Sequence, residues 1–320
     1  MTEFELIAQF FSGPAGRRPG RAPLGIGDDC ALLACAPGHE LAISTDMLVA
    51  GRHFFDDVDP ASLGWKTLAV NLSDLAAMGA RPLAFTLALA LPAVDEQWLA
   101  AFAGGLFDCA AAFDCELVGG DTTRGPLNLC VTVFGEVAAG RALRRGAAQV
   151  GDEVWVSGSL GGAALALQRL LASTSIDAGL RHLLERPTPR VALGQALAGV
   201  AHAAIDVSDG LAQDLGHILA ASHCGAELRC DALPFAAELV DEPVGERIRL
   251  ALSGGDDYEL CFTAAADRRA DVVRAGAASD TVVTRIGTVV AGHGLRVVDA
   301  NGADSGSVAP ALTTGFDHFR

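Results

Sequence analysis

Lysine is almost absent from this sequence of 320 residues. Lys66 is the single lysine, and the other 22 of the 23 basic residues are arginine. A P-loop requires Gly-Lys followed by Ser or Thr, whereas Lys66 follows Trp65. A P-loop is therefore excluded, and any ATP that this chain uses must bind through another architecture.

Basic residues as a whole are also scarce. The chain has 23 Lys and Arg against 39 Asp and Glu, which gives a formal net charge of −16. A molecule of this charge repels polyanions. The composition therefore argues against a nucleic-acid partner.

Secretion signals, CxxC pairs and long apolar runs are missing. Glu3 and Glu5 stand where a signal peptide would carry basic residues. The longest apolar stretch, around 83–91, is far shorter than the roughly 18 residues of a membrane span. The eight cysteines lie mostly in apolar contexts, as buried reduced thiols do (positions 30, 35, 109, 115, 130, 224, 230 and 261). We expect a cytoplasmic protein without a membrane anchor.

Aspartate, in contrast, is abundant, with 26 Asp against 13 Glu. Many of these residues stand in turns beside glycine or serine. Six such turns are Gly27-Asp28-Asp29, Ser44-Thr45-Asp46, Asn71-Leu72-Ser73-Asp74, Gly119-Gly120-Asp121-Thr122-Thr123, Asp206-Val207-Ser208-Asp209-Gly210 and Ser253-Gly254-Gly255-Asp256-Asp257. Converging carboxylates would repel one another by several kcal/mol at low dielectric. Bound Mg²⁺, which prefers oxygen ligands, would relieve that repulsion and bridge to phosphates.

The alternative for each turn is an ordinary helix cap or reverse turn. Six such turns together weaken that interpretation. Asp74 argues most strongly against it, because it lies inside a predicted helix, where aspartate is a poor choice without a partner.

Donors for phosphate are present as well. Glycine-rich turns at 119–120, 158–162 and 254–255 would let backbone N–H groups approach phosphate oxygens. Arg124 and Arg145 are candidate cationic contacts, with solvated surface arginines as the alternative. His53 could orient a substrate, although a lone histidine is more often structural.

Alternating strand and helix patterns predict an α/β fold. Thr2 with Glu5 forms a capping box, and Asp59-Pro60 opens a helix that stops at Gly79. The other predicted elements are strands at 41–46, 83–91, 115–121, 127–137, 153–158 and 203–207, and helices at 95–113 and 160–172. The length predicts about two domains. We place them at 1–138 and 139–320, with the boundary in a segment of small and polar residues.

Several motifs together make the sequence similar to one family. It resembles the thiamine-monophosphate kinases, which phosphorylate thiamine monophosphate with ATP and Mg²⁺. The matching segments, in family order over about residues 24–319, are GIGDDCALL, STDMLVAGRHF, WKTLAVNLSDLAAMGARP, LVGGDTTRG, RRGAAQVGDEVWVSGSLGGAALAL, RPTPR, AIDVSDGLAQDLGHI, SGGDDYELCF and GFDHF.

The resemblance implies two α/β domains without a P-loop. The first would bind ATP and Mg²⁺ and pair its sheet with that of a second copy in a homodimer, and the second would complete the active site. The implied Mg²⁺ ligands are Asp29, Ser44, Thr45, Asp46, Asp74, Asp121, Asp206 and Asp209, with Asp28 less certain. The implied ATP contacts are Gly120, Asp121, Arg145 and Ser208, and the substrate contacts are His53, Asp256, Asp257 and Phe316.

The implied reaction is direct in-line transfer of the terminal phosphate of ATP, assisted by several Mg²⁺ ions, with no covalent nucleophile. Related synthetases are the first alternative. Selenophosphate synthesis would require a reactive Cys or selenocysteine with a nearby Lys early in the chain, where this sequence has Gly and Arg and its sole lysine is Lys66. Aminoimidazole ribonucleotide synthesis is disfavoured by STDMLVAGRHF, RPTPR and GFDHF. The second alternative is a sensor that binds Mg²⁺ and nucleotide without turnover.

Overall fold

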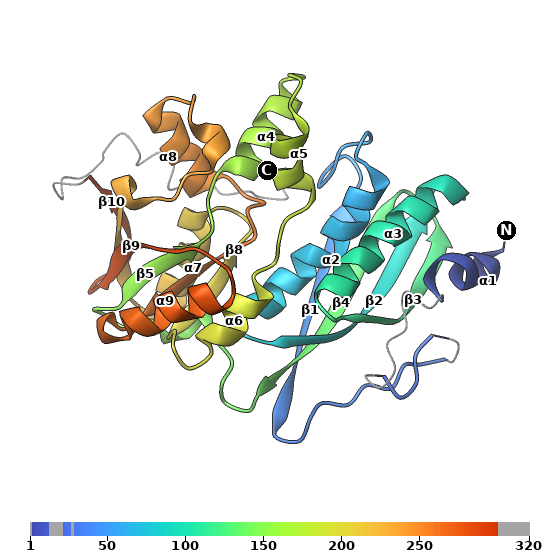
Figure 1. The fold of residues 1–320 in the computed structure, drawn as a ribbon, viewed down its shortest axis with the longest axis horizontal. Coiled ribbons are helices and arrows are strands. Elements are labelled where there is room, and N and C mark those ends of the chain that lie inside the picture. The colour runs from blue at the N-terminus through green and yellow to red at the C-terminus, as the bar shows by residue number, and fades with distance from the viewer. Residues whose placement is uncertain (1, 13–21, 27–28, 300–320) are drawn as a thin grey trace. The chain divides into compact units, whose positions relative to one another are not determined.

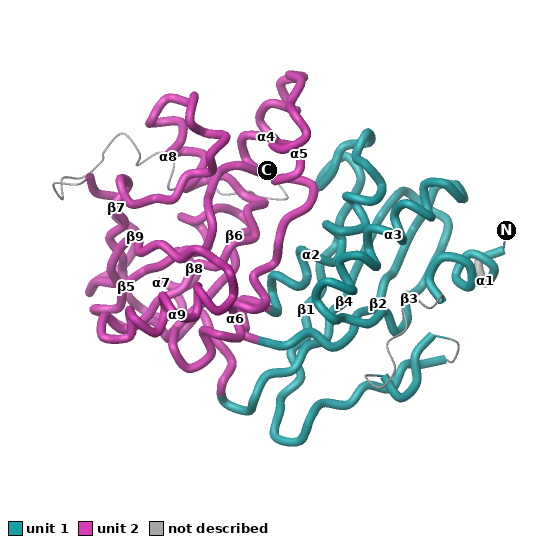
Figure 2. The backbone as a smooth tube through the Cα atoms, in the orientation of Figure 1, with its two compact units in different colours: residues 1–75, 80–140 teal, residues 76–79, 141–320 magenta. Residues whose placement is uncertain are grey.

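The structure is a computed structural model that describes residues 2–12, 22–26 and 29–299. Figure 2 shows its two compact units, residues 1–75 with 80–140 and residues 76–79 with 141–320. Each unit has its own β-sheet and helices (Figure 1), so the predicted mixed α/β class is confirmed. The separate roles assigned to 1–138 and 139–320 stay a prediction.

The sheet of the first unit has the strand order β1-β4-β2-β3. Its part of the chain contains α1 (Glu3–Leu6), η1 (Ile7–Phe11), β1 (His39–Val49), α2 (Pro60–Ala77), β2 (Arg81–Leu91), α3 (Glu96–Ala112), β3 (Glu116–Arg124) and β4 (Asn128–Ala138). Strand β4 is antiparallel to both β1 and β2, whereas β2 and β3 are parallel. Helix α3 supplies the crossover that a parallel pair needs.

The predicted helix caps are present. Thr2 and Glu5 form a reciprocal capping box, in which each backbone N–H donates to the other's side chain, at 2.8 and 3.3 Å. At the start of α2, Asp59 Oδ2 accepts the N–H of Ser62 at 2.8 Å. Gly79 ends the helix with a left-handed φ of +67°, which suits glycine.

The two faces of this sheet differ. Leu75 of α2 lies so close to Gly135 of β4 that a side chain at Gly135 would collide with it, so the helices cover this face (Figure 1). On the other face, β1 exposes Leu41, Ile43 and Met47 to 44%, 59% and 51%. Apolar rows of this kind are typical of an interaction surface.

The second unit has a six-stranded sheet in the order β10-β7-β9-β5-β8-β6. Its elements are η2 (Arg145–Ala147), β5 (Glu153–Ser157), α4 (Gly162–Leu171), α5 (Ala178–Glu185), α6 (Val191–Leu197), β6 (Ala203–Val207), α7 (Leu211–Ser222), β7 (Gly225–Arg229), η3 (Cys230–Ala232), η4 (Ala237–Leu239), α8 (Val244–Ser253), β8 (Glu259–Ala264), η5 (Ala266–Arg268), α9 (Arg269–Ala278), β9 (Val283–Val290) and β10 (Gly294–Val298). Strands β7 and β10 are parallel, and the other neighbouring pairs are antiparallel.

Alternation along these strands builds the main core of the second unit. Val156 and Ile205 point to the face that α7 and α8 cover, where they join Leu215 in one buried cluster. Trp155 and Phe262 stack on the opposite face at 6.5 Å between ring centroids. Because both faces of the sheet are apolar, β5 and β6 are fully buried strands, which places their C-terminal ends rigidly.

Candidate functional site

The first group of predicted residues lies where β1 meets α2. Ser44 Oγ donates to Asp74 Oδ2 at 2.5 Å. Two residues further along β1, the backbone N–H of Asp46 donates to Asn71 Oδ1 at 3.0 Å, and the Asn71 amide donates to the carbonyl of Thr67 at 3.1 Å. Side chains alternate along a strand, so Ser44 and Asp46 share the face toward α2. The structure thus supplies the partner that Asp74 needs inside a helix.

Thr45 lies on the other face of β1. Its hydroxyl is 2.8 Å from that of Thr132, its direct partner on β4. Within one copy of the chain, the Thr45 hydroxyl therefore points away from the Ser44–Asp74 pair. A metal role for Thr45 stays a prediction.

Gly120 and Asp121 lie on β3, at the opposite edge of the sheet from β1. Gly120 has a φ of +149°, and a Cβ there would lie 1.9 Å from the carbonyl oxygen of Leu87, so only glycine fits. Three strand spacings of about 4.8 Å separate β1 from β3, so the backbone of Asp121 lies about 14 Å from the backbone of Asp46. Since an Mg–O bond is only about 2 Å, one ion cannot join both carboxylates within one copy.

His53 has a fixed ring orientation. The N–H of Val49 donates to His53 Nδ1 at 3.0 Å, and the N–H of His53 donates to the carbonyl of Val49 at 3.0 Å. Because Nδ1 accepts a hydrogen bond, the neutral imidazole carries its proton on Nε2. The backbone therefore makes Nε2 a donor.

Five further predicted residues are exposed or lie outside the described residues. Asp29 is exposed in a bend. Arg124 is exposed at the end of β3, and Arg145 is exposed in η2. Asp28 and Phe316 lie outside the described residues.

A second group follows β6 in the second unit. Asp206 is 5% exposed, at the last position but one of the strand. The N–H groups of Ser208, Asp209 and Gly210 then donate to a single oxygen, Asp214 Oδ2, at 3.0, 3.1 and 3.1 Å. Asp214, in the first turn of α7, thus holds the backbone of the loop that contains the predicted residues.

The pKa of the Asp214 carboxyl group, which holds this loop, is set mainly by burial. Burial raises the pKa of Asp214 to about 7, and the carboxylate of Asp209 adds to the rise, against the lowering effect of the three N–H donors. Gln213 Nε2 donates to Asp209 Oδ2 at 3.0 Å, one turn along α7. The Asp209 carboxylate is therefore held as well as its backbone.

The loop between α8 and β8 is joined to this first loop. The N–H of Asp256 donates to the carbonyl of Ser208 at 2.9 Å, and the N–H of Tyr258 donates to the carbonyl of Val207 at 2.8 Å. Asp256 and Tyr258 have left-handed φ values of +68° and +50°, which cost energy in non-glycine residues. A Cβ at Gly255 would lie 2.3 Å from the Ser208 carbonyl oxygen, so glycine permits the contact.

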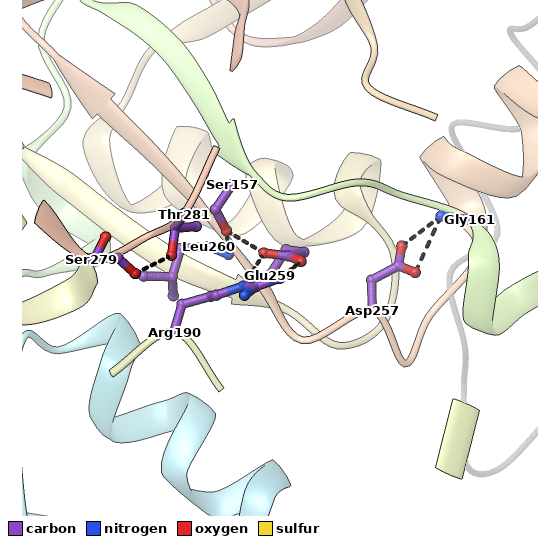
Figure 3. Close-up of polar contacts among 8 residues, drawn as sticks. All are labelled: Ser157, Gly161, Arg190, Asp257, Glu259, Leu260, Ser279 and Thr281. Carbon is purple, nitrogen blue, oxygen red and sulfur yellow. Dashed lines mark hydrogen bonds and ion pairs between the residues drawn. The ribbon is translucent and has the colours of Figure 1, made fainter. Parts of the chain in front are cut away.

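Asp257 lies at the N-terminus of α4 (Figure 3). Both of its carboxylate oxygens accept the N–H of Gly161, at 2.9 and 3.1 Å. Burial raises the pKa of Asp257 well above its usual value, and the negative charge of Glu259 raises it further. The hydrogen bond from the Gly161 N–H acts in the opposite direction and lowers the pKa. The turn at 158–162, which the sequence suggested for phosphate, thus directs a donor to a carboxylate of the chain itself.

Asp257 also lines a cavity of about 130 Å³ within the second unit. The RPTPR segment, 186–190, forms another part of its wall. Arg190 Nε donates to Glu259 Oε2 at 2.7 Å and its Nη2 to Oε1 at 2.5 Å, while Ser157 Oγ donates to Oε2 at 2.5 Å (Figure 3). The cavity wall therefore carries a neutralised Arg190–Glu259 pair beside Asp257.

Comparison with known proteins gives this arrangement a context. Residues 27–137 match the family described as AIR synthase related protein, N-terminal domain, and residues 149–300 match its C-terminal domain. The chain is 48% identical over 330 residues to the thiamine-monophosphate kinase of Salmonella typhimurium, covering 99% of this chain and 98% of that relative. The chain belongs to the thiamine-monophosphate kinase family.

Two solved structures agree with this. The thiamine-monophosphate kinase from Stenotrophomonas maltophilia K279a is 46% identical with a TM-score of 0.86, over 95% of this chain and 98% of that one. A structure described as AaThiL complexed with AMPPCP and TMP is 29% identical with a TM-score of 0.77, over 89% of each chain. The predicted resemblance and the predicted fold are confirmed, and the chain is an enzyme of this kinase family.

The donor atoms in both groups suit Mg²⁺. Each group, taken within its own unit, offers oxygen atoms: Ser44 and Asp74 in the first and Asp209 in the second, which is the ligand chemistry of a hard cation. Over the ranges that the structure describes, no three His, Cys, Asp or Glu side chains form a metal-binding group by themselves. The residues fit Mg²⁺ by chemistry, and the ligand set stays a prediction.

Sequence reasoning did not single out four residues that shape the candidate site. Asn71 shares a face of α2 with Asp74, at a spacing of three residues that could have revealed it. Asp214 stands in SDGLAQD, where a first-turn aspartate reads as an ordinary cap. Arg190 and Glu259 are far apart in sequence, and no local signal pairs them.

The cysteines and the helices bear on the predictions of reduced thiols and of no membrane span. All eight cysteines are free thiols, of which Cys109, Cys115, Cys224 and Cys261 are buried and Cys30 is exposed. Within residues 2–12, 22–26 and 29–299, none of the helices is both long enough and apolar enough to cross a bilayer.

Proposed function

We propose that this enzyme transfers the terminal phosphoryl group of ATP to thiamine monophosphate, giving thiamine diphosphate and ADP in thiamine diphosphate biosynthesis. The observation that carries the proposal is 48% identity to a thiamine-monophosphate kinase across nearly the whole length of both chains. The AMPPCP and TMP in the AaThiL structure support the same pair of substrates.

Several Mg²⁺ ions would be held by two groups of residues. Ser44, Asp46 and Asp74 offer oxygens in the first unit, and Asp206 and Asp209 offer carboxylates in the second. Asp29, Thr45 and Asp121 complete the proposed set by resemblance. When bound, Mg²⁺ supplies positive charge that screens the phosphates and stabilises the charge of the transition state. In this chain, Ser44 orients Asp74, and Asn71 holds the backbone of β1 at Asp46.

The transfer is proposed to be direct and in line. The phosphate of thiamine monophosphate is already anionic near neutral pH, so no strong base and no protein nucleophile are required. Gly120, Asp121, Arg145 and Ser208 are the proposed ATP contacts. Since the N–H of Ser208 donates to Asp214 and its carbonyl accepts from the other loop, its contact with ATP would be made by the hydroxyl.

The proposed substrate contacts divide by charge. Nε2–H of His53 is a donor suited to the phosphate of thiamine monophosphate. Asp257 offers a carboxylate to the cationic thiazolium part, with Asp256 beside it, while Glu259 is already neutralised by Arg190. Phe316, proposed to pack on the thiamine rings, lies outside the described residues.

We also propose a cytoplasmic homodimer. The apolar row of Leu41, Ile43 and Met47 on the sheet face without helices would be covered by a second copy.

The direct test is incubation with ATP, Mg²⁺ and thiamine monophosphate, followed by chromatography for thiamine diphosphate. Asp74→Asn should lower the rate by about a hundredfold or more, since it weakens an oxygen ligand and the bond from Ser44. Asp108→Asn, at an exposed position of α3, is the matched control and should retain wild-type activity. Absence of product from folded wild-type protein in excess Mg²⁺ would favour the synthetase or sensor alternative.

A further inference from the structure

One buried carboxylate holds the loop that contains Ser208 and Asp209. Asp214 is 3% exposed, and three consecutive backbone N–H groups donate to the same oxygen of its side chain. A conventional cap precedes its helix and accepts one or two N–H groups. Asp214 instead lies within α7 and reaches back four to six residues, so its contacts shape the loop.

Consecutive N–H groups that converge in this way form a concave site for an anion. Here the anion is supplied from within the chain, so residues 208–210 do not offer these N–H groups to a phosphate. Without Asp214, three partly or fully buried donors would have no acceptor, and each would cost about 1–3 kcal/mol unless the loop moved. We expect the loop to move.

The other side of the loop is fixed independently. The carbonyls of Val207 and Ser208 accept N–H groups from the loop after α8. Gly210 has a φ of +119°, and a Cβ there would lie 2.9 Å from the backbone carbon of Ser253. With the carbonyl side held by that loop and the N–H side by Asp214, the Ser208 hydroxyl and the Asp209 carboxylate keep one direction.

We propose that Asp214 is a positioning residue for phosphoryl transfer, fixing the backbone at 208–210 so that Ser208 and Asp209 face Mg²⁺-bound ATP. The inference rests on the function proposed above. It predicts that Asp214 acts on the nucleotide and metal side of the reaction more than on thiamine monophosphate. Its role depends on an oxygen acceptor at this place, which asparagine also provides.

The test compares Asp214→Ala with Asp214→Asn in the full-length enzyme. The measurements are KM for ATP, the Mg²⁺ concentration for half-maximal rate, KM for thiamine monophosphate and the melting temperature. Asp214→Ala should raise the first two by about tenfold to a hundredfold and KM for thiamine monophosphate by less than about threefold. Asp214→Asn should keep both KM values and the half-maximal Mg²⁺ concentration within about threefold of wild type.

Two further variants separate positioning from stability. Asp95→Ala removes another carboxylate that accepts two backbone N–H groups, at the start of α3, and should lower the melting temperature without changing either KM. Asp214→Glu keeps the charge but displaces the acceptor, and should raise KM for ATP if Asp214→Ala does not fold.

Three results would overturn the inference. They are a change in melting temperature alone, equal changes in KM for both substrates, or no recovery in Asp214→Asn. Wild-type enzyme that forms no thiamine diphosphate would instead refute the proposed function, and the inference with it. If the wild type is active but Asp214→Ala and Asp214→Glu keep the wild-type KM for ATP and Mg²⁺ dependence, the inference is refuted and the proposed function is not.

Discussion

Gly255→Ala should damage the contact between the two loops of the second unit. The loop with Ser208 and Asp209 and the loop with Asp256 and Asp257 meet where the backbone of Gly255 approaches the Ser208 carbonyl. The substitution adds one methyl group at this point and changes no charge. Its effect therefore measures how much the reaction depends on the two loops staying together.

The magnitude follows from the geometry. The new Cβ would lie 2.3 Å from the Ser208 oxygen, about 1 Å inside ordinary contact, and both atoms are fixed to backbone. Overpacking of this kind costs about 1–3 kcal/mol, and loss of the Asp256 N–H bond to Ser208 adds about 1 kcal/mol. For a unit of this size, a total of about 2–4 kcal/mol lowers the melting temperature by about 4–16 °C.

Calorimetry and steady-state kinetics provide the assay. We expect KM for ATP and KM for thiamine monophosphate to rise together, because both loops are displaced. Gly245→Ala is the matched control, since a Cβ there has no atom within 4 Å and alanine favours the helix by about 0.5–1 kcal/mol. A Gly255→Ala enzyme with wild-type melting temperature and both KM values unchanged would refute the reasoning.

Three other predictions concern separate parts of the chain. Arg190→Ala should destabilise the second unit by about 3–5 kcal/mol in chemical denaturation, because it leaves the buried Glu259 without a cationic partner; a loss below about 1 kcal/mol would contradict this. Burial tends to raise the pKa of Glu136, but a backbone N–H and Arg81 outweigh it and lower the pKa below 4.5. Because the folded-state pKa is lowered, the ionised Glu136 stabilises the fold above pH 4.5, and this stabilisation is lost as the pH falls below 4.5. The loss of stability caused by Glu136→Gln should therefore become smaller as the pH falls through that range, and a loss independent of pH would contradict the assignment. Ile43→Asp should convert the proposed dimer to a monomer in sedimentation, and an unchanged sedimentation coefficient would argue against pairing through this face.

The ends of helices could be predicted because their signals are short-range. Three of the six predicted turns were wrong, because 44–46, 71–74 and 119–123 lie inside β1, α2 and β3. The helix expected from Asp59 to Gly79 is α2, Pro60–Ala77, and the one expected at 95–113 is α3, Glu96–Ala112. Caps and stop signals act within a few residues of where they stand, so a linear sequence contains them in full. The same holds for the strand-to-turn transition that places Asp206 at the end of β6.

Relations between distant segments could not be predicted in the same way. The face on which Thr45 lies depends on its pairing with β4, almost ninety positions away. Asp257 caps the N-terminus of α4 through a fold-dependent contact, so the glycines at 158–162 suggested phosphate instead. Gly255 serves a close backbone approach rather than an anion. Tertiary packing decides which acceptor a free N–H group receives.

The most direct test of direct phosphoryl transfer uses ATP labelled in its terminal phosphate. The enzyme is mixed with labelled ATP, Mg²⁺ and thiamine monophosphate, quenched at short times, and separated into nucleotide, thiamine and protein fractions. Direct transfer predicts that label lost from ATP appears in thiamine diphosphate, with none retained on the protein at any time. Label that first accumulates on the protein, or a thiamine diphosphate fraction without label, would contradict it.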